Sequence, residues 1–391
     1  MEAKRIAIYS GEIPSTTFVE RLIEGLAAKK HQIFLFGGVK KNPKYHYKNI
    51  KVIGYTGKAS KFFLYVKYSL LLLLFQPSSK RKLDRLLKKK GGNIKLHKVK
   101  FYPVLWSRPD VFHIQWAKSV PDWMWVQNFG IKLVVSLRGA HVNYSPIADL
   151  KLAQIYKDTF PLVDGFHAVS DAIGKEAMKY GASGDKIKIG YSGLETDQFF
   201  NSKFGVEKEN QTFKILSVGR AHWVKGYSYA LDACKLLLNQ GISFEYTIIG
   251  AEGYEELVYQ KSDLNLGESV KFVKNVPFSK VKAFMEESDL VLMPSVEEGI
   301  ANVVLEAMAL GTLVLTADCG GMTEVVKEGS NGFVVPNRNS EAIALKIIEI
   351  MGLPKEIKNK ILVQARKDIE QKNSKQQMVD AIEELYENVL Q

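Results

Sequence analysis

The sequence contains little cysteine: Cys234 and Cys319 are the only two among 391 residues. This scarcity argues against a disulfide framework and fits a reducing compartment. The sequence opens on a strand-like run, residues 5–9, without the apolar core of a signal peptide. We therefore expect a cytoplasmic protein.

Long uninterrupted apolar runs are also missing. The most apolar stretch, residues 62–75, is broken by Lys67 and is too short to span a bilayer. It cannot serve as a transmembrane anchor, and we expect it to be a helix packed in the protein core. With 391 residues and 46% apolar composition, the chain is long enough for two or three globular domains.

Acidic residues are scarce in the first quarter of the chain. Residues 1–100 contain 23 Lys and Arg against 5 Asp and Glu, a formal charge of +18, although the whole chain carries only +12. The remaining residues are therefore net acidic. A patch this basic attracts an anionic surface, which a membrane leaflet, a nucleic acid or an acidic polymer would each provide.

The basic residues are densest between residues 80 and 90, where leucines recur at helical spacing. Leu83, Leu86 and Leu87 would form an apolar stripe between cations, as in a helix that lies on a membrane surface. The alternative is a helix whose leucines pack on a sheet and whose cations are solvated. We favour membrane contact, because the charge exceeds what solubility requires. The predicted membrane-contacting residues are Lys80, Arg81, Lys82, Arg85, Lys88, Lys89 and Lys90.

Short apolar runs alternate with helix-length amphipathic stretches along the chain, which predicts an α/β fold of parallel sheets with helices on both faces. These runs are too numerous for one small sheet. A segment rich in Gly, Ser and polar residues around residue 195 interrupts the alternation, and we place a domain boundary there. The expected strands are 6–9, 33–36, 111–115, 133–137, 165–169, 214–218, 246–249, 270–273, 290–293, 313–316 and 333–335.

Two carboxylates flank the start of a strongly apolar helix expected after residue 301. Glu306 lies among valine, leucine, alanine and methionine, where a carboxylate is tolerated only beside a polar ligand or a buried partner. Glu298 lies eight residues earlier, just before a turn at Gly299. Between them, the backbone amides of residues 300–302 are free at the helix start, where an anion is favoured. These residues therefore predict an anion-binding site at the start of this helix.

Five motifs in the second half of the chain occur in an order that resembles the retaining glycosyltransferases of family 4. The matching motifs are Val-Gly-Arg at 218–220 with Lys225 and Gly226, residues 292–295, residues 298–311, residues 318–326 and residues 331–336. The resemblance is close over residues 190–340 and looser before them. It implies the GT-B fold, in which two Rossmann-like domains, each a doubly wound parallel sheet, face a central cleft.

The same resemblance implies how the chain is divided. Residues 1–195 would form the acceptor-side domain, which includes the basic helices. Residues 196–372 would form the donor domain, and a C-terminal helix within residues 373–391 would cross back to the first domain.

By resemblance, the donor is a nucleotide-diphosphate sugar whose diphosphate becomes the leaving group. Arg220 and Lys225 would stabilise the negative charge that develops on it. Glu306 would accept the ribose hydroxyls, Glu298 would contact the transferred sugar, and the anomeric configuration would be retained. The alternative is that these charged residues form structural ion pairs. The predicted donor-binding residues are Gly219, Arg220, Lys225, Glu298, Ile300, Ala301, Asn302 and Glu306.

No Asp-x-Asp pair stands at the end of an expected strand, and no His or Cys cluster has ligand spacing. We therefore expect metal-independent chemistry without a cofactor, in which Arg220 and Lys225 replace the ion. The predicted catalytic residues are Glu298, Arg220, Lys225 and His141.

Two segments of the first half are expected on the acceptor side. Ser15, Thr16 and Thr17 follow the first strand and resemble a Pro-x-Ser-Glu-Thr-Phe loop of exopolysaccharide glycosyltransferases. Their hydroxyls would bind sugar or cap a helix, and capping is the better interpretation. Arg138 and His141 occupy the first and last positions of a segment that is His-Gly-x-Asp in many relatives. His141 would contact the donor sugar or position the acceptor, or else be a satisfied structural histidine.

Together with these observations, the resemblance implies a hexosyltransferase-type enzyme that transfers a sugar with retention to a glycan or lipid-linked acceptor in polysaccharide or glycolipid synthesis. Its partners would be a nucleotide sugar and the anionic inner face of the cell membrane. The alternatives are a soluble small-molecule glycosyltransferase and a GT-B nucleotide-sugar epimerase. A nucleic-acid-binding protein is a third alternative, but the sequence contains no RNA-recognition motif, zinc spacing or aromatic-basic interleaving. We therefore expect no nucleic acid as a partner.

Overall fold

The computed structural model describes residues 3–41, 43–91, 93–199 and 212–391. The chain divides into two compact units, and each is described here by itself. The first unit contains residues 1–169, 173–193 and 375–391, and the second contains residues 170–172 and 194–374. The sequence predicts domain boundaries after residues 195 and 372, whereas the contacts divide the chain after residues 193 and 374.

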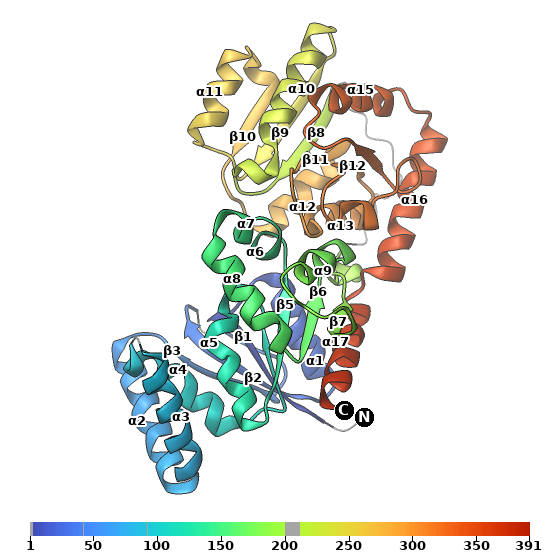
Figure 1. Ribbon diagram of the computed structural model, residues 1–391. Coiled ribbons are helices and arrows are strands. Elements are labelled where there is room, and N and C mark those ends of the chain that lie inside the picture. Colours follow the sequence, from blue (N-terminus) through green and yellow to red (C-terminus); the bar gives the residue numbers. More distant parts are fainter. Residues whose placement is uncertain (1–2, 42, 92, 200–211) are drawn as a thin grey trace. The chain divides into compact units, whose positions relative to one another are not determined.

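The first unit contains, within its described residues, a seven-stranded sheet in which all neighbouring strands are parallel. The strand order is β3-β2-β1-β4-β5-β6-β7, so the chain leaves β1 in one direction and later returns to extend the sheet in the other (Figure 1). Such strands are buried on both faces and read as continuous apolar runs. The strands are β1 (Arg5–Ile13), β2 (Gln32–Val39), β3 (Ile50–Tyr55), β4 (Val111–Ile114), β5 (Lys132–Leu137), β6 (Gly165–Ala168) and β7 (Ile187–Ile189).

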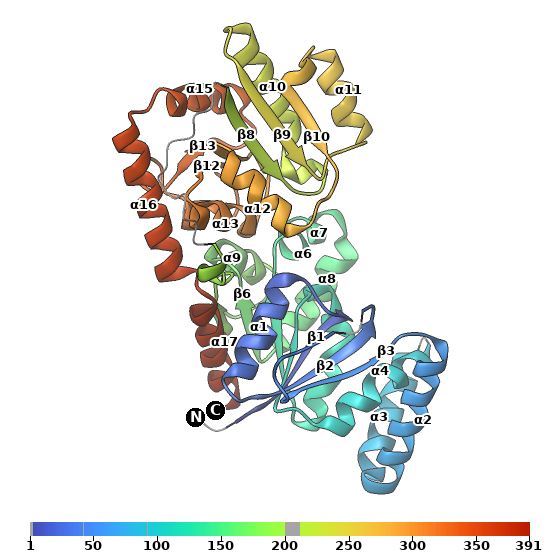
Figure 2. The same ribbon diagram turned by 180° about the vertical axis from the view of Figure 1, so that it is seen from behind.

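Side chains along these strands alternate between two cores, one on each face of the sheet. Ile6 and Ile8 of β1 pack with α1 and α17, whereas Ala7 packs in the core that α2, α3, α4 and α8 cover. Figures 1 and 2 show α2, α3 and α4 side by side near the β3 edge. The helices are α1 (Thr17–Ala28), α2 (Lys58–Phe75), α3 (Pro77–Lys90), α4 (Ile94–Ser107), α5 (Val120–Trp123), α6 (Ala140–Asn143), α7 (Ser145–Ala148), α8 (Leu150–Thr159), α9 (Asp171–Met178) and α17 (Lys375–Leu390).

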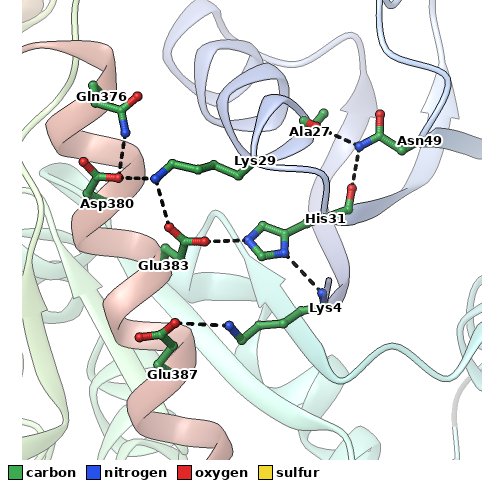
Figure 3. A network of polar contacts seen from close by, with 9 residues as sticks. All are labelled: Lys4, Ala27, Lys29, His31, Asn49, Gln376, Asp380, Glu383 and Glu387. Atoms are coloured by element: carbon green, nitrogen blue, oxygen red, sulfur yellow. Dashed lines mark hydrogen bonds and ion pairs between the residues drawn. The ribbon is translucent and has the colours of Figure 1, made fainter. Parts of the chain in front are cut away.

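The last helix of the chain, α17, is bound to the first unit by a network of charged side chains (Figure 3). Glu383 accepts hydrogen bonds from Lys29 Nζ at 3.2 Å and from His31 Nε2 at 2.9 Å. The His31 ring accepts the backbone N–H of Lys4 at Nδ1, so the proton lies on Nε2 and is donated to Glu383. Burial opposes ionisation of Glu383, but the hydrogen bonds from His31 and Lys29 outweigh it and lower the pKa of the carboxyl group. A C-terminal segment therefore completes the N-terminal unit.

The second unit contains a six-stranded parallel sheet, among the residues described, with the order β10-β9-β8-β11-β12-β13. Ile215 and Leu292 face the core formed with α10 and α15, whereas Leu216 and Val291 face the core formed with α12, α13 and α16. The elements are β8 (Phe213–Val218), β9 (Phe244–Ile249), β10 (Val270–Val273), β11 (Leu290–Met293), β12 (Leu313–Ala317), β13 (Phe333–Val335), α10 (Tyr227–Asn239), α11 (Glu255–Asp263), α12 (Phe278–Glu287), α13 (Asn302–Leu310), α14 (Met322–Val325), α15 (Ser340–Met351) and α16 (Lys355–Lys372).

The two doubly wound parallel sheets agree with the predicted α/β class. Each strand expected from the sequence is present, and β3 and β7 are additional. In both units the loops after the parallel strands gather at one edge of the sheet, which is where such folds place their ligands. The predicted site residues lie in these loops and at the helix starts that follow them.

Candidate functional site

Lys225 and Glu298, which the sequence assigns to one site, are in direct contact in the second unit. Lys225 Nζ forms an ion pair with Glu298 Oε1, and Ser295 Oγ donates a hydrogen bond to the same oxygen at 3.1 Å. The two charged side chains are largely buried, with exposures of 22% and 16%. Loss of solvent strengthens the attraction between them. The pair therefore holds a cation and a carboxylate in one defined arrangement.

A glycine allows the two loops that carry this pair to approach each other. Gly226 follows Lys225 and has a φ of 65°, in the left-handed region. A Cβ atom at Gly226 would lie 1.9 Å from the carbonyl oxygen of Pro294, so only glycine fits without displacement. The Val296 N–H donates to the Val224 carbonyl oxygen at 2.8 Å and ties the same loops together. The backbone thus positions the Lys225 ammonium beside Glu298.

A third loop, which follows β12, packs on the backbone of Glu298. The Gly321 N–H is shared between the carbonyl oxygens of Glu298 and Gly299, at 3.3 and 3.0 Å. Gly320 has a φ of 50°, and a Cβ atom there would lie 1.7 Å from the Glu298 oxygen. The sequence analysis did not assign Gly320, Gly321 or Ser295 to the site. The signal for the two glycines is their position directly after a buried strand, within a matched motif.

The start of α13 provides only part of the predicted anion-binding site. Within the described chain, the backbone amides of Ile300 and Asn302 have no hydrogen-bond acceptor. The Ala301 amide, however, donates to the Met322 sulfur at 3.3 Å. The prediction of a free amide at Ala301 is therefore wrong, because α14 places a thioether over it. The Asn302 side chain adds a buried Oδ1 atom that lacks a partner among the described residues.

Glu306 and Arg220 differ sharply in their environment. Glu306 lies one turn into α13, on the same face as Asn302, and is only 9% exposed among buried apolar neighbours. Arg220 is exposed directly after β8, and it forms no ion pair with any described residue. The structure therefore does not support a salt-bridge role for Arg220. Gly219, which precedes it, accepts a hydrogen bond from Tyr227 Oη at its carbonyl oxygen, at 3.1 Å.

A cavity of about 350 Å³ lies beside this site rather than within it. Its lining includes Trp223, Val296 and Arg338, but neither Lys225 nor Glu298. The predicted donor residues instead lie at the loop ends after β8 and β11 and in the first turns of α13. No group of three or more His, Cys, Asp or Glu side chains is placed to hold a metal ion in the ranges that the structure describes.

In the first unit, Ser15 and Thr16 lie between β1 and α1, and Thr17 is the first residue of α1. Thr16 is the N-cap residue of α1, yet its side chain makes no capping hydrogen bond. The Glu20 carboxylate instead accepts the backbone N–H of Ser15 at 2.5 Å. Capping by the hydroxyl, which the sequence favours, is therefore wrong for Thr16. Both Thr16 and Thr17 are exposed.

Arg138 directly follows β5 and His141 lies in the short helix α6, and both are in an unusual environment for polar side chains. Arg138 Nη2 donates to Gln115 Oε1 at 3.0 Å, and the guanidinium lies 4.3 Å from the centre of the Phe18 ring. Burial lowers the pKa of Arg138 to about 9, and burial together with the charge of Lys118 lowers the pKa of His141 to about 4. His141 is therefore neutral at pH 7. Its Nδ1 atom is buried without a partner in the described ranges, which argues against a satisfied structural histidine.

The basic helix predicted to contact a membrane is α3. Its leucines do not form a lipid-facing stripe, because Leu83 and Leu87 are buried in the core and Leu86 packs against it. This part of the prediction is wrong, and the alternative of leucines packed inside the protein is correct. The outward face of α3 is cationic: Lys80 is partly buried, whereas Arg81, Lys82, Arg85, Lys88, Lys89 and Lys90 are exposed.

The apolar helix α2 is exposed where the sequence predicts burial. Of its residues, all of which are described, only Tyr68 and Leu72 are buried. Phe63 and Leu74 are 69% and 70% exposed, and α2 lies on the outside of the helix layer (Figures 1 and 2). The exposed apolar residues of α2 are Phe62, Phe63, Leu70, Leu73, Leu74 and Phe75. A contiguous apolar face of this kind marks an interaction surface. Among the described helices, none is both long and apolar enough to cross a bilayer.

Two sequence profiles of known families match consecutive halves of the chain. The family described as "Glycosyltransferase Family 4" matches residues 15–198, and the one described as "Glycosyl transferases group 1" matches residues 198–368. Their junction lies close to the boundary between the two structural units.

Individual proteins show the same relationship. The amylovoran biosynthesis glycosyltransferase AmsK of Erwinia amylovora is 33% identical over 177 residues, 44% of this chain and 43% of AmsK. The putative colanic acid biosynthesis glycosyltransferase WcaL of Escherichia coli is 28% identical over 227 residues, 55% of this chain and 54% of WcaL. The chain thus spans about half the length of these relatives. HepE from Anabaena, solved in complex with UDP-glucose, is 18% identical with a TM-score of 0.71, over 97% of this chain and 98% of HepE.

The two doubly wound units and the structural likeness to HepE over nearly the whole chain show that the chain has the GT-B fold. The predicted fold is confirmed. Because the two profiles together cover residues 15–368, the chain belongs to glycosyltransferase family 4.

Proposed function

We propose that this protein transfers a hexosyl unit from a nucleotide-diphosphate sugar to a glycan or lipid-linked acceptor, with retention and without a metal ion. The contact between Lys225 and Glu298 carries the proposal. It places a cation, which suits a diphosphate leaving group, beside a carboxylate, which suits the positive charge that develops at the anomeric carbon. The binding of UDP-glucose by HepE supports a nucleotide-sugar donor.

The remaining donors for the diphosphate would come from Arg220 and the start of α13. Arg220 is exposed, and a guanidinium can bind two phosphate oxygens at once. The amides of Ile300 and Asn302 lie at a helix N-terminus, where the dipole favours an anion. Negative charge on the diphosphate grows as the glycosidic bond breaks, so these groups bind the transition state more tightly than the substrate. Glu306, one turn further along α13, would accept the ribose hydroxyls.

The proposed acceptor belongs to exopolysaccharide or cell-envelope glycan synthesis. The names of AmsK and WcaL refer to amylovoran and colanic acid synthesis, which supports this class of product. We place the reaction on the cytoplasmic side, because the donor is a nucleotide sugar and the two cysteines are unpaired.

The proposed location is the inner face of the cell membrane, with an anionic leaflet as the partner. The exposed apolar face of α2 would bury in the boundary between headgroups and acyl chains, and the cations of α3 would meet lipid phosphates. Near such a surface each Lys or Arg contributes about 1 kcal/mol. Full burial of a Phe or Leu side chain contributes about 1.5–3 kcal/mol. The two helices together therefore supply both the apolar burial and the electrostatic attraction that peripheral binding requires.

Thermal stabilisation by a panel of UDP-, GDP-, ADP- and dTDP-sugars tests the proposed activity. One nucleotide class is expected to bind the folded protein, and a ligand at 100 times its Kd raises the free energy of unfolding by about 2.7 kcal/mol. The stabilising sugar should then be transferred to acceptor glycan at a rate that EDTA does not change. Hydrolysis of the donor without transfer would favour an epimerase instead. Failure of every nucleotide to stabilise the protein would contradict the proposal.

Vesicle flotation tests the proposed location. The wild type is expected to float at low salt with vesicles that contain phosphatidylglycerol, and not with vesicles of phosphatidylcholine alone. Phe63→Ser together with Leu74→Ser should reduce the bound fraction about 10-fold or more, because both side chains lose their burial in lipid. Leu150→Ser is the matched control, since Leu150 of α8 is 79% exposed but lies outside α2. Wild-type protein that stays unbound in both cases would indicate a soluble glycosyltransferase.

A further inference from the structure

The first unit contains an arginine whose charge no other described side chain neutralises. Arg138 follows β5 directly, and Nη2 donates to the neutral amide oxygen of Gln115 at 3.0 Å. The Nε atom is buried and has no acceptor within the described residues. No carboxylate pairs with the guanidinium in that part of the chain. A buried guanidinium N–H without an acceptor is unfavourable, so a ligand that accepts a hydrogen bond from it would stabilise this arrangement.

Two further polar atoms beside Arg138 also lack partners. Gln115 is fully buried, and its Nε2 atom finds no acceptor in the described ranges, although its Oε1 atom accepts from Ser136 Oγ at 3.4 Å. His141 Nδ1 is buried and equally without a partner among the residues described. Buried polar atoms are almost always hydrogen-bonded in folded proteins. Three buried nitrogens without partners on neighbouring residues therefore indicate a site that can bind a polar ligand.

The sheet topology explains why these atoms lie together. Gln115 directly follows β4 and Arg138 directly follows β5, and these strands are parallel neighbours. The carboxyl ends of both strands therefore meet at the same edge of the sheet. The His141 ring lies 5.5 Å from the ring of Trp116, the residue after Gln115.

Phe18 packs against the Arg138 guanidinium but accepts no hydrogen bond from its N–H groups. The ring centre lies 4.3 Å from Arg138 Cζ, within the range of a cation–π contact. Such a contact uses the face of the guanidinium, and the N–H groups at its edge stay available for planar hydrogen bonding. Another charged neighbour, Lys118, adds positive potential at His141. The local field therefore favours a negatively charged ligand.

We propose that Arg138, Gln115 and His141 bind an oxyanion of the substrate, either the carboxylate of a uronic acid or the phosphate of a lipid-linked acceptor. The guanidinium would bind two oxygens of the group in its plane, and Gln115 Nε2 would donate to one of them. His141 would add a hydrogen bond as a neutral ring. This inference rests on the proposed function, because it assumes that the ligand is a donor sugar or an acceptor of the transfer reaction.

Two matched ligand pairs test the proposal and identify the source of the anion. UDP-glucuronate and UDP-glucose differ only by a carboxylate in place of a hydroxymethyl group, and farnesyl phosphate and farnesol differ only by the phosphate. The wild type is expected to bind the anionic member of one pair about 10- to 100-fold more tightly, as a charge-assisted hydrogen-bonded pair requires. A preference in the first pair assigns the anion to the donor sugar, and a preference in the second assigns it to the acceptor.

Substitution of Arg138 then tests whether this residue causes the preference for the anionic ligand. Arg138→Gln should remove it while leaving the affinity for the free nucleotide unchanged, because the nucleotide site lies in the second unit. Arg108→Gln is the control, since this exposed arginine of the same unit donates only to Ser79 Oγ among described side chains, at 2.8 Å. If Arg138→Gln fails to fold, Arg138→Lys is the second variant. It keeps the charge but cannot form bidentate hydrogen bonds, so it should still weaken the preference for the anionic ligand.

Equal wild-type affinities within both pairs would overturn the proposal, and so would a preference that survives both substitutions of Arg138. These outcomes are distinct from failure of the proposed function. If no nucleotide of the panel binds, the donor assignment fails. If a nucleotide binds but neither anion is preferred, only the assignment of Arg138 fails.

Discussion

Glu298→Gln is expected to lower kcat about 10²- to 10³-fold and to change the Kd of the nucleotide by less than about threefold. Glutamine keeps the size of the side chain and the oxygen that faces Ser295 Oγ, so the loop should keep its shape. What is lost is the negative charge beside Lys225, which is needed only as positive charge develops at the anomeric carbon. The effect should therefore appear in turnover rather than in nucleotide binding.

Initial rates with the nucleotide sugar identified by the stabilisation panel, together with calorimetric binding of the free nucleotide, separate these two quantities. Glu297→Gln is the matched control, because it removes the same charge from the neighbouring position. It is expected to keep kcat within about threefold of wild type. Wild-type turnover in Glu298→Gln, or equal losses in the two variants, would remove the catalytic assignment of Glu298.

Most strands, including the edge strands β10 and β13 of the second sheet, could be read from the sequence, whereas the two edge strands of the first sheet could not. Every strand of the second sheet was predicted, because a parallel strand covered on both faces is a short continuous apolar run. The missed strand β3 is an edge strand that carries Lys51 and Gly54 and is partly exposed along its length. The other, β7, has only three residues, none of them fully buried. Neither has the two-sided burial that produces a clear pattern.

The composition of a helix also does not predict which of its faces packs against the rest of the protein. Helix α2 is apolar around most of its circumference, which predicts a core helix, yet Phe63 and Leu74 are exposed. Helix α3 shows leucines between cations, which predicts a lipid-facing stripe, yet Leu83 and Leu87 are buried. The packing of α2, α3 and α4 against one another decides both cases, and it depends on contacts that local periodicity does not encode.

The individual site residues were recognisable, but their contacts were not. Lys225 and Glu298 belong to separate motifs 73 positions apart, and only the neighbouring strands β8 and β11 bring them together. The Ala301 amide looked free because the sequence cannot place Met322 over it. The same limit applies to Arg138, whose departure from the family motif is visible in the sequence but whose unsatisfied neighbours are not. Motifs therefore identify functional groups, and the fold determines which of them act together.

Gly226→Ala is expected to lower the free energy of unfolding by about 3–5 kcal/mol, an exceptionally large effect for the addition of one methyl group. Alanine at a φ of 65° is strained, and its Cβ would lie 1.9 Å from the carbonyl oxygen of Pro294. Relief of this overlap requires the loop that carries Lys225 to move away from the loop that carries Glu298. Stability and nucleotide affinity should therefore fall together.

Gly253→Ala separates backbone strain from the close approach, because Gly253 has a similar φ of 72° but no heavy atom within 4 Å of the added methyl group. Strain alone should cost about 1–2 kcal/mol at this position. Urea unfolding of both variants, with calorimetric titration of the nucleotide, measures the difference. If the two alanine variants lose equal stability and bind nucleotide equally well, the contact at Gly226 does not position Lys225. A larger loss of stability and of nucleotide affinity in Gly226→Ala alone would show that the close contact between Gly226 and Pro294 positions Lys225 beside Glu298.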